Sequence, residues 1–354
     1  MAELSPYELR ALKQVQEHRE HELARSPRRL IPERARAEAS RRAAAVTERV
    51  RKNPVGDRAA HLAAASYKRA IDGVGKATSR LANTTLSEKR VVKALSRHGH
   101  TVTTLCGIRQ LDLEVIDDLR PRRLDFLYAA AAAAEGALAG GVISGGEALA
   151  LFGSVESAGA AAVPGFGTIA AAVGGDAVFV LAAGSRAVAH TAMYYGYDPN
   201  DPAEKLYIMA VLNLGTATTG SAKYIAYREL SQLAQQLARN ATWAALRQHG
   251  LTRVAEGFAA QMSVRLTQKK LGQLVPIVGI VTGAGLNYAL LDSICDAAHW
   301  AYRERFLVDK QGGGSAFALP EPPPEPAPDD QHEAAVSVLE ILDDDKDRGR
   351  GLPA

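Results

Sequence analysis

The feature that most limits the fold of this chain is a long run of small apolar residues in its middle. From Leu124 to Ala192 the sequence is dominated by Ala, Gly, Val, Leu and Ile. Gly136 and Gly140 lie four positions apart, which places both on one helix face and lets two helix backbones approach closely, in lipid or in a tightly packed soluble bundle. We therefore predict Gly/Ala-rich apolar helical hairpins and leave both settings open.

Whether this run crosses a membrane depends on its continuity. Residues 159–184 contain one charged residue, Asp176, so their length permits a membrane span of about 20 residues. Pro164 and several glycines disfavour a continuous helix, so a hairpin or re-entrant element fits better. A second small-residue element runs from 274 to 291 and passes into a polar helix, and we expect it to pack against the first. It contains Pro276, Gly279, Gly283 and Gly285.

The amino-acid composition favours helices throughout the chain. The hydrophobic share is 47% but the aromatic share is only 6%, so the core must be built from Ala, Leu, Val and Gly. Small side chains favour closely spaced helices over a thick β-sandwich. The predicted fold class is all-α: a multi-helix bundle with Gly/Ala-rich apolar helical hairpins and a disordered acidic C-terminal tail.

Two helix starts are marked by capping residues. Ser5, Pro6 and Glu8 predict a reciprocal capping box for a helix that runs to about residue 25, and Asp201 with Glu204 predicts another start that continues to about residue 215. Further helices are expected at 33–52, 58–72, 86–98, 108–119, 176–194, 223–248 and 251–270.

Charge divides the chain into three regions. Residues 1–100 hold 22 Lys/Arg against 11 Asp/Glu, whereas residues 311–354 hold 3 against 10. We predict a basic N-terminal helical region at 1–120, a Gly/Ala-rich helical core at 121–310 and a disordered Pro-rich acidic tail at 311–354. The basic region is compatible with anionic lipid, with nucleic acid or with the acidic tail of the same chain.

The cysteine count and the N-terminus bear on the compartment. Cys106 and Cys295 are too few for a disulfide framework and lack paired metal-ligand spacing, so a reducing cytoplasm is the simplest location. Glu3 and Glu8 interrupt any apolar run near the N-terminus, which argues against a secretory signal.

Candidate site residues gather on two helices. At 100° per residue, Asp176, His190 and Tyr194 share one helix face, with Arg186 to the side, as a buried acid/base or ligand-binding seam or as a structural hydrogen-bond network. Asp292, Asp296 and His299 also share a face and could offer ligands to a metal, although a solvated polar face explains them better, so no metal site and no cofactor is predicted.

The order of several motifs resembles the EcsC protein family over about residues 5–308. The residues that carry the resemblance are Tyr7, Glu8, the glycine-rich block, Asp176, the turn Tyr195, Gly196, Tyr197 and Asp198, and the block Val275, Pro276, Ile277, Val278 and Gly279 with Gly283, Gly285 and Asn287. The family takes its name from an association with an ABC exporter, so the resemblance implies membrane contact or a role in export. It transfers no catalytic residue.

These observations lead to two functional expectations. The first is a non-enzymatic, membrane-associated helical protein, peripheral or partly inserted at the inner face of the cell membrane, with membrane lipid or a membrane protein as partner and no specific nucleic acid. The acidic tail adds a docking site for a protein partner. The alternative is a soluble helical enzyme or ligand-binding domain that uses the seam, with Asn287 and Asp292 as further polar candidates.

Overall fold

A computed structural model describes residues 4–24, 88–120, 125–131, 179–217, 219–238, 258, 261–262 and 279–312. Every regular element in these ranges is a helix, which confirms the all-α fold class. Several predictions fall outside the described residues: the glycine pairs of the central run, Asp176, Pro276, the helices expected at 33–52 and 58–72, and the tail from residue 313 onward.

The labelled helices follow the chain in a simple order. They are α1 (Pro6–Ala24), α4 (Glu88–Arg97), α5 (Leu105–Ile108), α6 (Leu113–Leu119), α9 (Pro202–Thr216), α10 (Gly220–Ala238) and α12 (Gly279–Lys310). Two further helical segments occupy 125–131 and 179–194. None of these described helices combines the length and the apolar character that crossing a bilayer requires.

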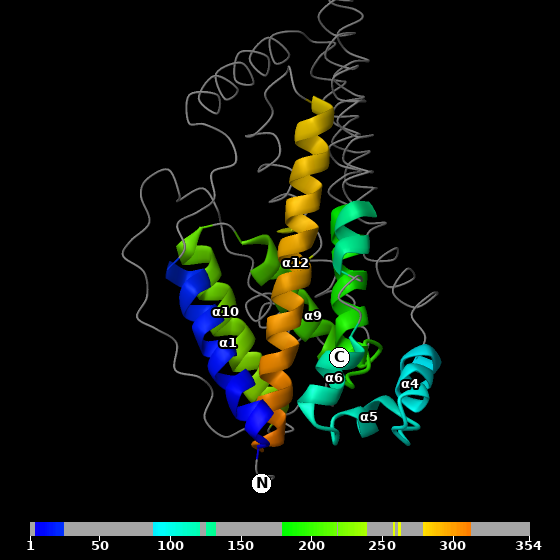
Figure 1. Ribbon diagram of the computed structural model, residues 1–354. Coiled ribbons are helices and arrows are strands. Elements are labelled where there is room, and N and C mark those ends of the chain that lie inside the picture. Colours follow the sequence, from blue (N-terminus) through cyan, green and yellow to red (C-terminus); the bar gives the residue numbers. More distant parts are fainter. Residues whose placement is uncertain are drawn as a thin grey trace, which may run out of the picture.

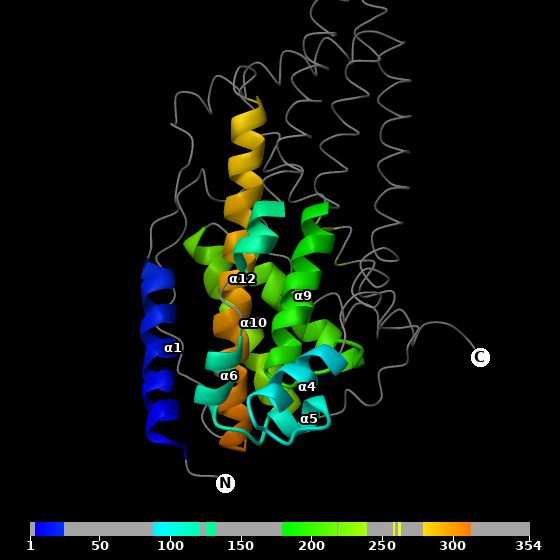
Figure 2. The ribbon, with the colours of Figure 1, turned by 45° about the vertical axis from the view of Figure 1, so that its right-hand side comes forward.

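The long helix α12 forms the axis of the bundle. It packs most extensively against α9, and α10 packs against both of them. Figures 1 and 2 show α1 lying along the outer side of α12 and α10, while α4, α5 and α6 gather near the C-terminal end of α12. α12 is continuous from Gly279, so the small-residue element that we expected at 274–291 and the polar helix after it are parts of one helix over their described residues.

The helix α1 begins as its capping residues predict. Glu8 donates its backbone N–H to the Ser5 hydroxyl, and Ser5 donates its own N–H to the Glu8 carboxylate at 3.0 Å. The same carboxylate also accepts the backbone N–H of Leu113 at 3.1 Å and pairs with Lys310. Glu8 therefore not only caps α1 but also joins this helix to the start of α6 and the end of α12.

One predicted helix begins later in the structure than expected. We expected a single helix at 108–119, but α5 ends at Ile108 and α6 begins at Leu113. The reason is Asp112, whose side chain accepts the backbone N–H of Glu114 at 2.9 Å and so starts a new helix. The predicted end at Leu119 was right, and the predicted start at Ile108 was wrong.

Two glycines let three helices meet at short distance. A Cβ on Gly215 of α9 would lie 2.6 Å from the Cα of Ile294 on α12. A Cβ on Gly184 would lie 3.0 Å from Leu212 Cδ2 and 3.1 Å from Ile294 Cδ1. Small residues therefore do permit close helix packing here, whereas Gly285, one of the glycines expected in that role, is exposed and would have nothing within 4 Å of an added Cβ.

The turn after residue 194 also depends on a glycine. Gly196 has φ +84°, and an added Cβ would lie 2.7 Å from the carbonyl oxygen of Leu105. Only glycine adopts this backbone conformation so close to another chain segment without strain. The flanking residues Tyr195 and Tyr197 are buried and point their rings into the bundle, where both pack against Tyr302.

The core is more aromatic than the composition led us to expect. The largest fully buried side chains include Tyr195, Tyr207, Tyr302 and Phe306. The chain has few aromatic residues, yet several of them converge on the C-terminal half of α12. The expectation of a core built from Ala, Leu, Val and Gly is therefore incomplete for the described residues.

Candidate functional site

The predicted polar seam forms in part on the helix at 179–194. His190 Nδ1 lies 3.4 Å from the hydroxyl oxygen of Tyr128, and the His190 and Tyr194 rings have centroids 5.5 Å apart. Arg186 hydrogen-bonds Tyr128, which comes from the helical segment 125–131. Three of the predicted residues thus come together, and Tyr128 joins them from a different part of the chain.

The seam holds its histidine in the neutral form. Burial lowers the pKa of His190 to about 4, and the positive charges of Arg186 and Arg120 lower it in the same direction. Burial also raises the pKa of Tyr194 and of Tyr128. A neutral imidazole beside a phenol that keeps its proton can accept and donate hydrogen bonds, which suits either a polar ligand or a structural network.

Arg120 connects the seam to a second polar cluster. Its guanidinium pairs with both carboxylate oxygens of Asp125, at 2.7 and 2.8 Å, at the start of segment 125–131. Its charge also acts on His190, Tyr195 and His299. Sequence reasoning did not select Arg120, because an Arg before a Pro at a helix end gives no signal of burial.

The second polar cluster is centred on Asp117 of α6. Asp117 accepts the Tyr7 hydroxyl at 2.8 Å and the Tyr195 hydroxyl at 3.4 Å, and it pairs with Arg303 of α12 at 3.1 Å. The Tyr195 hydroxyl also lies 3.1 Å from His299 Nδ1. The cluster therefore ties α1, α6 and α12 to the turn after residue 194.

Burial sets the protonation states in this cluster. It raises the pKa of Asp117 despite the opposing charge of Arg303, and it raises the pKa of Tyr7 to about 12. It lowers the pKa of His299 to about 3, helped by the charges of Arg120 and Arg303. His299 is thus largely enclosed, so of the three residues of the solvated polar face that we expected on α12 only Asp292 and Asp296 are exposed.

A third cluster surrounds Arg305, which is buried near the C-terminal end of α12. Its Nη1 lies 2.7 Å from the Glu204 carboxylate, which also accepts the Tyr302 hydroxyl. The guanidinium carbon lies 4.1 Å from the ring centroid of Tyr197 and 4.3 Å from that of Tyr207. The sequence predicted Glu204 as a capping residue, but the structure uses its carboxylate as the buried partner of Arg305.

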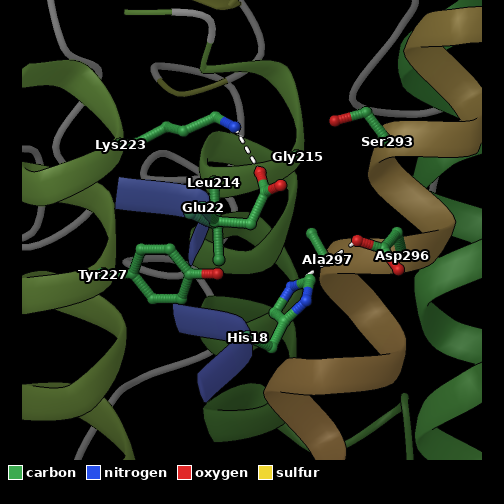
Figure 3. Close-up of a pocket in the computed structure, with 9 residues that line it drawn as sticks. All are labelled: His18, Glu22, Leu214, Gly215, Lys223, Tyr227, Ser293, Asp296 and Ala297. Carbon is green, nitrogen blue, oxygen red and sulfur yellow. Dashed lines mark hydrogen bonds and ion pairs between the residues drawn. The ribbon is translucent and has the colours of Figure 1, made fainter. Parts of the chain in front are cut away.

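A small polar pocket lies between α1, α9, α10 and α12 (Figure 3). Its volume of about 20 Å³ is enough for a water-sized molecule but not for a substrate. His18 of α1 stacks on Trp300 with ring centroids 4.2 Å apart and faces the Asp296 carboxylate at 3.6 Å. Partial burial and the nearby Glu22 carboxylate raise the pKa of Asp296 to about 6, while Glu22 itself pairs with Lys223.

Metal ligands do not converge in the described part of the chain. No group of three or more His, Cys, Asp or Glu side chains there is placed to hold a metal ion. Asp296 accepts the Trp300 indole N–H at 3.1 Å, whereas His299 faces Tyr195, so the helical spacing of these residues does not aim them at one point.

Comparison with known proteins shows that part of this chain is similar to one protein family. Residues 154–307 match the model of the EcsC protein family. We refer to these matched residues, which are less than half of the chain, as the EcsC region. An uncharacterized protein of Bacillus subtilis (strain 168), YdbA, is 27% identical over 137 residues, which are 38% of this chain and 47% of the relative, so the match spans about half the length of that protein. No solved structure matches the chain.

The EcsC region is shorter than the resemblance that we expected from residue 5. It contains the helix at 179–194, α9, α10 and α12 up to Leu307, which hold His190, Glu204 and Arg305. Tyr7 and Glu8 lie outside it, on α1. The two remaining predicted site residues are on α12, where Asn287 is buried and Asp292 is exposed.

Proposed function

We propose that this protein is a membrane-associated helical protein that works at the inner face of the cell membrane. In this proposal the described helices form a folded body, and the apolar run that begins near Leu124 makes the lipid contact. The partners are membrane lipid or a membrane protein such as an ABC exporter, the class from which the EcsC family takes its name. The proposal assigns no reaction to the protein.

The observation that carries the proposal is a pair of exposed apolar side chains where the run begins. Phe126 and Leu127 are each 61% exposed, although most large apolar side chains in the described residues are buried. Asp125, which precedes them, is held to the bundle by Arg120. Adjacent exposed Phe and Leu side chains on a fixed helix are suited to entering a lipid surface.

Removing these two side chains is expected to weaken membrane binding. Burial of one such side chain contributes about 1.5–3 kcal/mol, so Phe126→Ser with Leu127→Ser should lower partitioning into vesicles of phosphatidylcholine and phosphatidylglycerol by at least about tenfold. The measurement is flotation of the purified full chain with vesicles at several lipid concentrations.

The matched control uses other exposed apolar residues. Leu9 on α1 is 55% exposed and Ile225 on α10 is 38% exposed, and both lie away from the start of the apolar run. Leu9→Ser with Ile225→Ser should leave partitioning unchanged. The proposal would be contradicted if both double variants weakened partitioning equally. It would also be contradicted if none of the wild-type protein floated with the vesicles.

A ligand-binding role for the seam is the second candidate. It is favoured by the convergence of Tyr128, Arg186 and His190 from two separate helices. If the seam binds a polar ligand, His190→Ala should abolish the thermal stabilisation that such a ligand gives, and Tyr194→Phe should reduce it. A thermal-shift screen of small anionic metabolites tests this, with His98→Ala in the exposed turn after α4 as control. If neither seam variant loses the stabilisation, the seam does not bind the ligand.

A further inference from the structure

We propose that the acidic segment around Asp343, Asp344 and Asp345 docks on the exposed basic face of α4 in the same chain. This goes beyond membrane association, because the contact is within one molecule and needs no lipid. Its consequence for the membrane, which rests on the proposed function, is that the tail competes with anionic lipid for the same basic surface.

The basic face of α4 consists of Lys89, Arg90, Lys93 and Arg97. All four are exposed, while Val91 and Leu95 on the opposite side are buried and hold the helix on the bundle. Among the residues that the structure describes, no carboxylate forms an ion pair with any of these four side chains. Four cations within three turns of one helix make a strong local positive potential that attracts an acidic segment.

The tail leaves the bundle at the same end as this basic face. Asp309, near the end of α12, accepts the Tyr197 hydroxyl at 2.8 Å and lies 3.8 Å from Arg109, which follows α5. α5 in turn donates the backbone N–H of Leu105 to Glu88 at the start of α4, at 3.2 Å. Figures 1 and 2 both show α4, α5 and the C-terminal end of α12 at one end of the molecule.

The chain beyond α12 is long enough and carries the complementary charge. The 31 residues that follow Gly312, up to and including Asp343, reach up to about 100 Å when extended, far more than the path from α12 to α4 by way of α5 requires. Residues 311–354 hold 10 acidic against 3 basic side chains. Tethering gives such a segment a local concentration in the millimolar range, so even weak ion pairs keep it bound.

Within this arrangement the tail regulates access to α4. Each basic residue near an anionic membrane contributes about 1 kcal/mol to binding, so covering four of them removes a large part of the electrostatic attraction. High salt weakens the tail contact, because the Debye length falls from about 8 Å at 0.15 M to about 3 Å at 1 M. A strongly anionic surface displaces the tail by offering more negative charge than the tail does.

The test is zero-length carbodiimide cross-linking of the full chain without lipid, read by mass spectrometry. Carbodiimide joins a carboxylate to a lysine amine with loss of water, so we expect cross-links from Lys89 and Lys93 to Asp343, Asp344 or Asp345. Arg90→Gln with Arg97→Gln keeps both reactive lysines and should reduce these cross-links at least several-fold. Asp343→Asn, Asp344→Asn and Asp345→Asn together should remove them.

Controls separate this contact from unfolding, from oligomerisation and from the membrane proposal. Arg10→Gln with Arg228→Gln removes two exposed arginines elsewhere, on α1 and α10, and should leave the cross-links unchanged. Mixed ¹⁴N and ¹⁵N protein must give cross-links within one isotope only; mixed pairs would assign the tail to a second copy and overturn the proposal. Absence of the cross-links, or equal loss in the control variant, would overturn it too, whatever flotation shows about lipid.

Discussion

Replacing Glu204 with alanine is expected to lower the free energy of unfolding by about 3–5 kcal/mol. The reason is the position of Arg305, which is buried, pairs with Glu204 at 2.7 Å and is enclosed by aromatic rings. Burial alone would lower the pKa of Arg305, but the Glu204 charge raises it, so this guanidinium keeps its proton. Without Glu204 an uncompensated charge remains in the core, and the Tyr302 hydroxyl loses its acceptor.

Urea denaturation followed by circular dichroism measures this effect. The control is Glu17→Ala, which breaks the exposed i,i+4 pair with Lys13 and should change the free energy of unfolding by less than about 0.5 kcal/mol. Glu204→Ala combined with Arg305→Met should recover part of the loss, because an apolar side chain of similar length needs no counter-charge. A loss for Glu204→Ala no larger than that for Glu17→Ala would contradict the buried-pair interpretation.

Replacing Gly215 with alanine is expected to lower the free energy of unfolding by about 1–3 kcal/mol. The added Cβ would lie 2.6 Å from the Cα and 3.2 Å from the backbone N of Ile294. Backbone atoms cannot rotate away as a side chain can, so α9 and α12 must separate. Since these two helices share the most extensive contact in the bundle, the separation loosens its centre.

Gly285→Ala is the matched control on α12. This position is exposed and has nothing within 4 Å of an added Cβ, so the substitution should raise the free energy of unfolding by about 0.4–1 kcal/mol by restricting the unfolded chain. Opposite signs for the two Gly→Ala variants are the expected outcome in thermal and urea denaturation. The same sign for both would show that helix propensity, and not the α9–α12 approach, decides the effect.

The helix starts were predictable because their signals are local. Ser5 and Glu8 cap α1, and Asp201 accepts the backbone N–H of Ala203 at 2.9 Å at the start of α9, as their spacing indicates. The two partners of a capping interaction are at most three positions apart, so the local sequence contains both of them. The start of α6 shows the limit, because the capping role of Asp112 competes with an apolar pattern that extends the predicted helix back to Ile108.

The candidate site was predictable only in part, for a related reason. Helical periodicity placed Arg186, His190 and Tyr194 together, since all three belong to one helix. It gave no indication of Tyr128, which reaches the seam from another segment, or of Arg120, whose charge acts on His190. Helical periodicity also indicated which residues of α12 share a face. Which of these faces is buried depends on how α1, α6 and α9 pack against the helix.

The sequence by itself therefore determined the all-α class and the capped helix starts, because each follows from backbone geometry or from neighbours a few residues away. Only the tertiary structure decided that Glu204 pairs with Arg305, that Gly184 and Gly215 lie at the close helix contacts, and that α4 lies at the same end of the molecule as the end of α12. These features join residues that are far apart in the chain, and the free energy of such contacts exists only once the helices are packed.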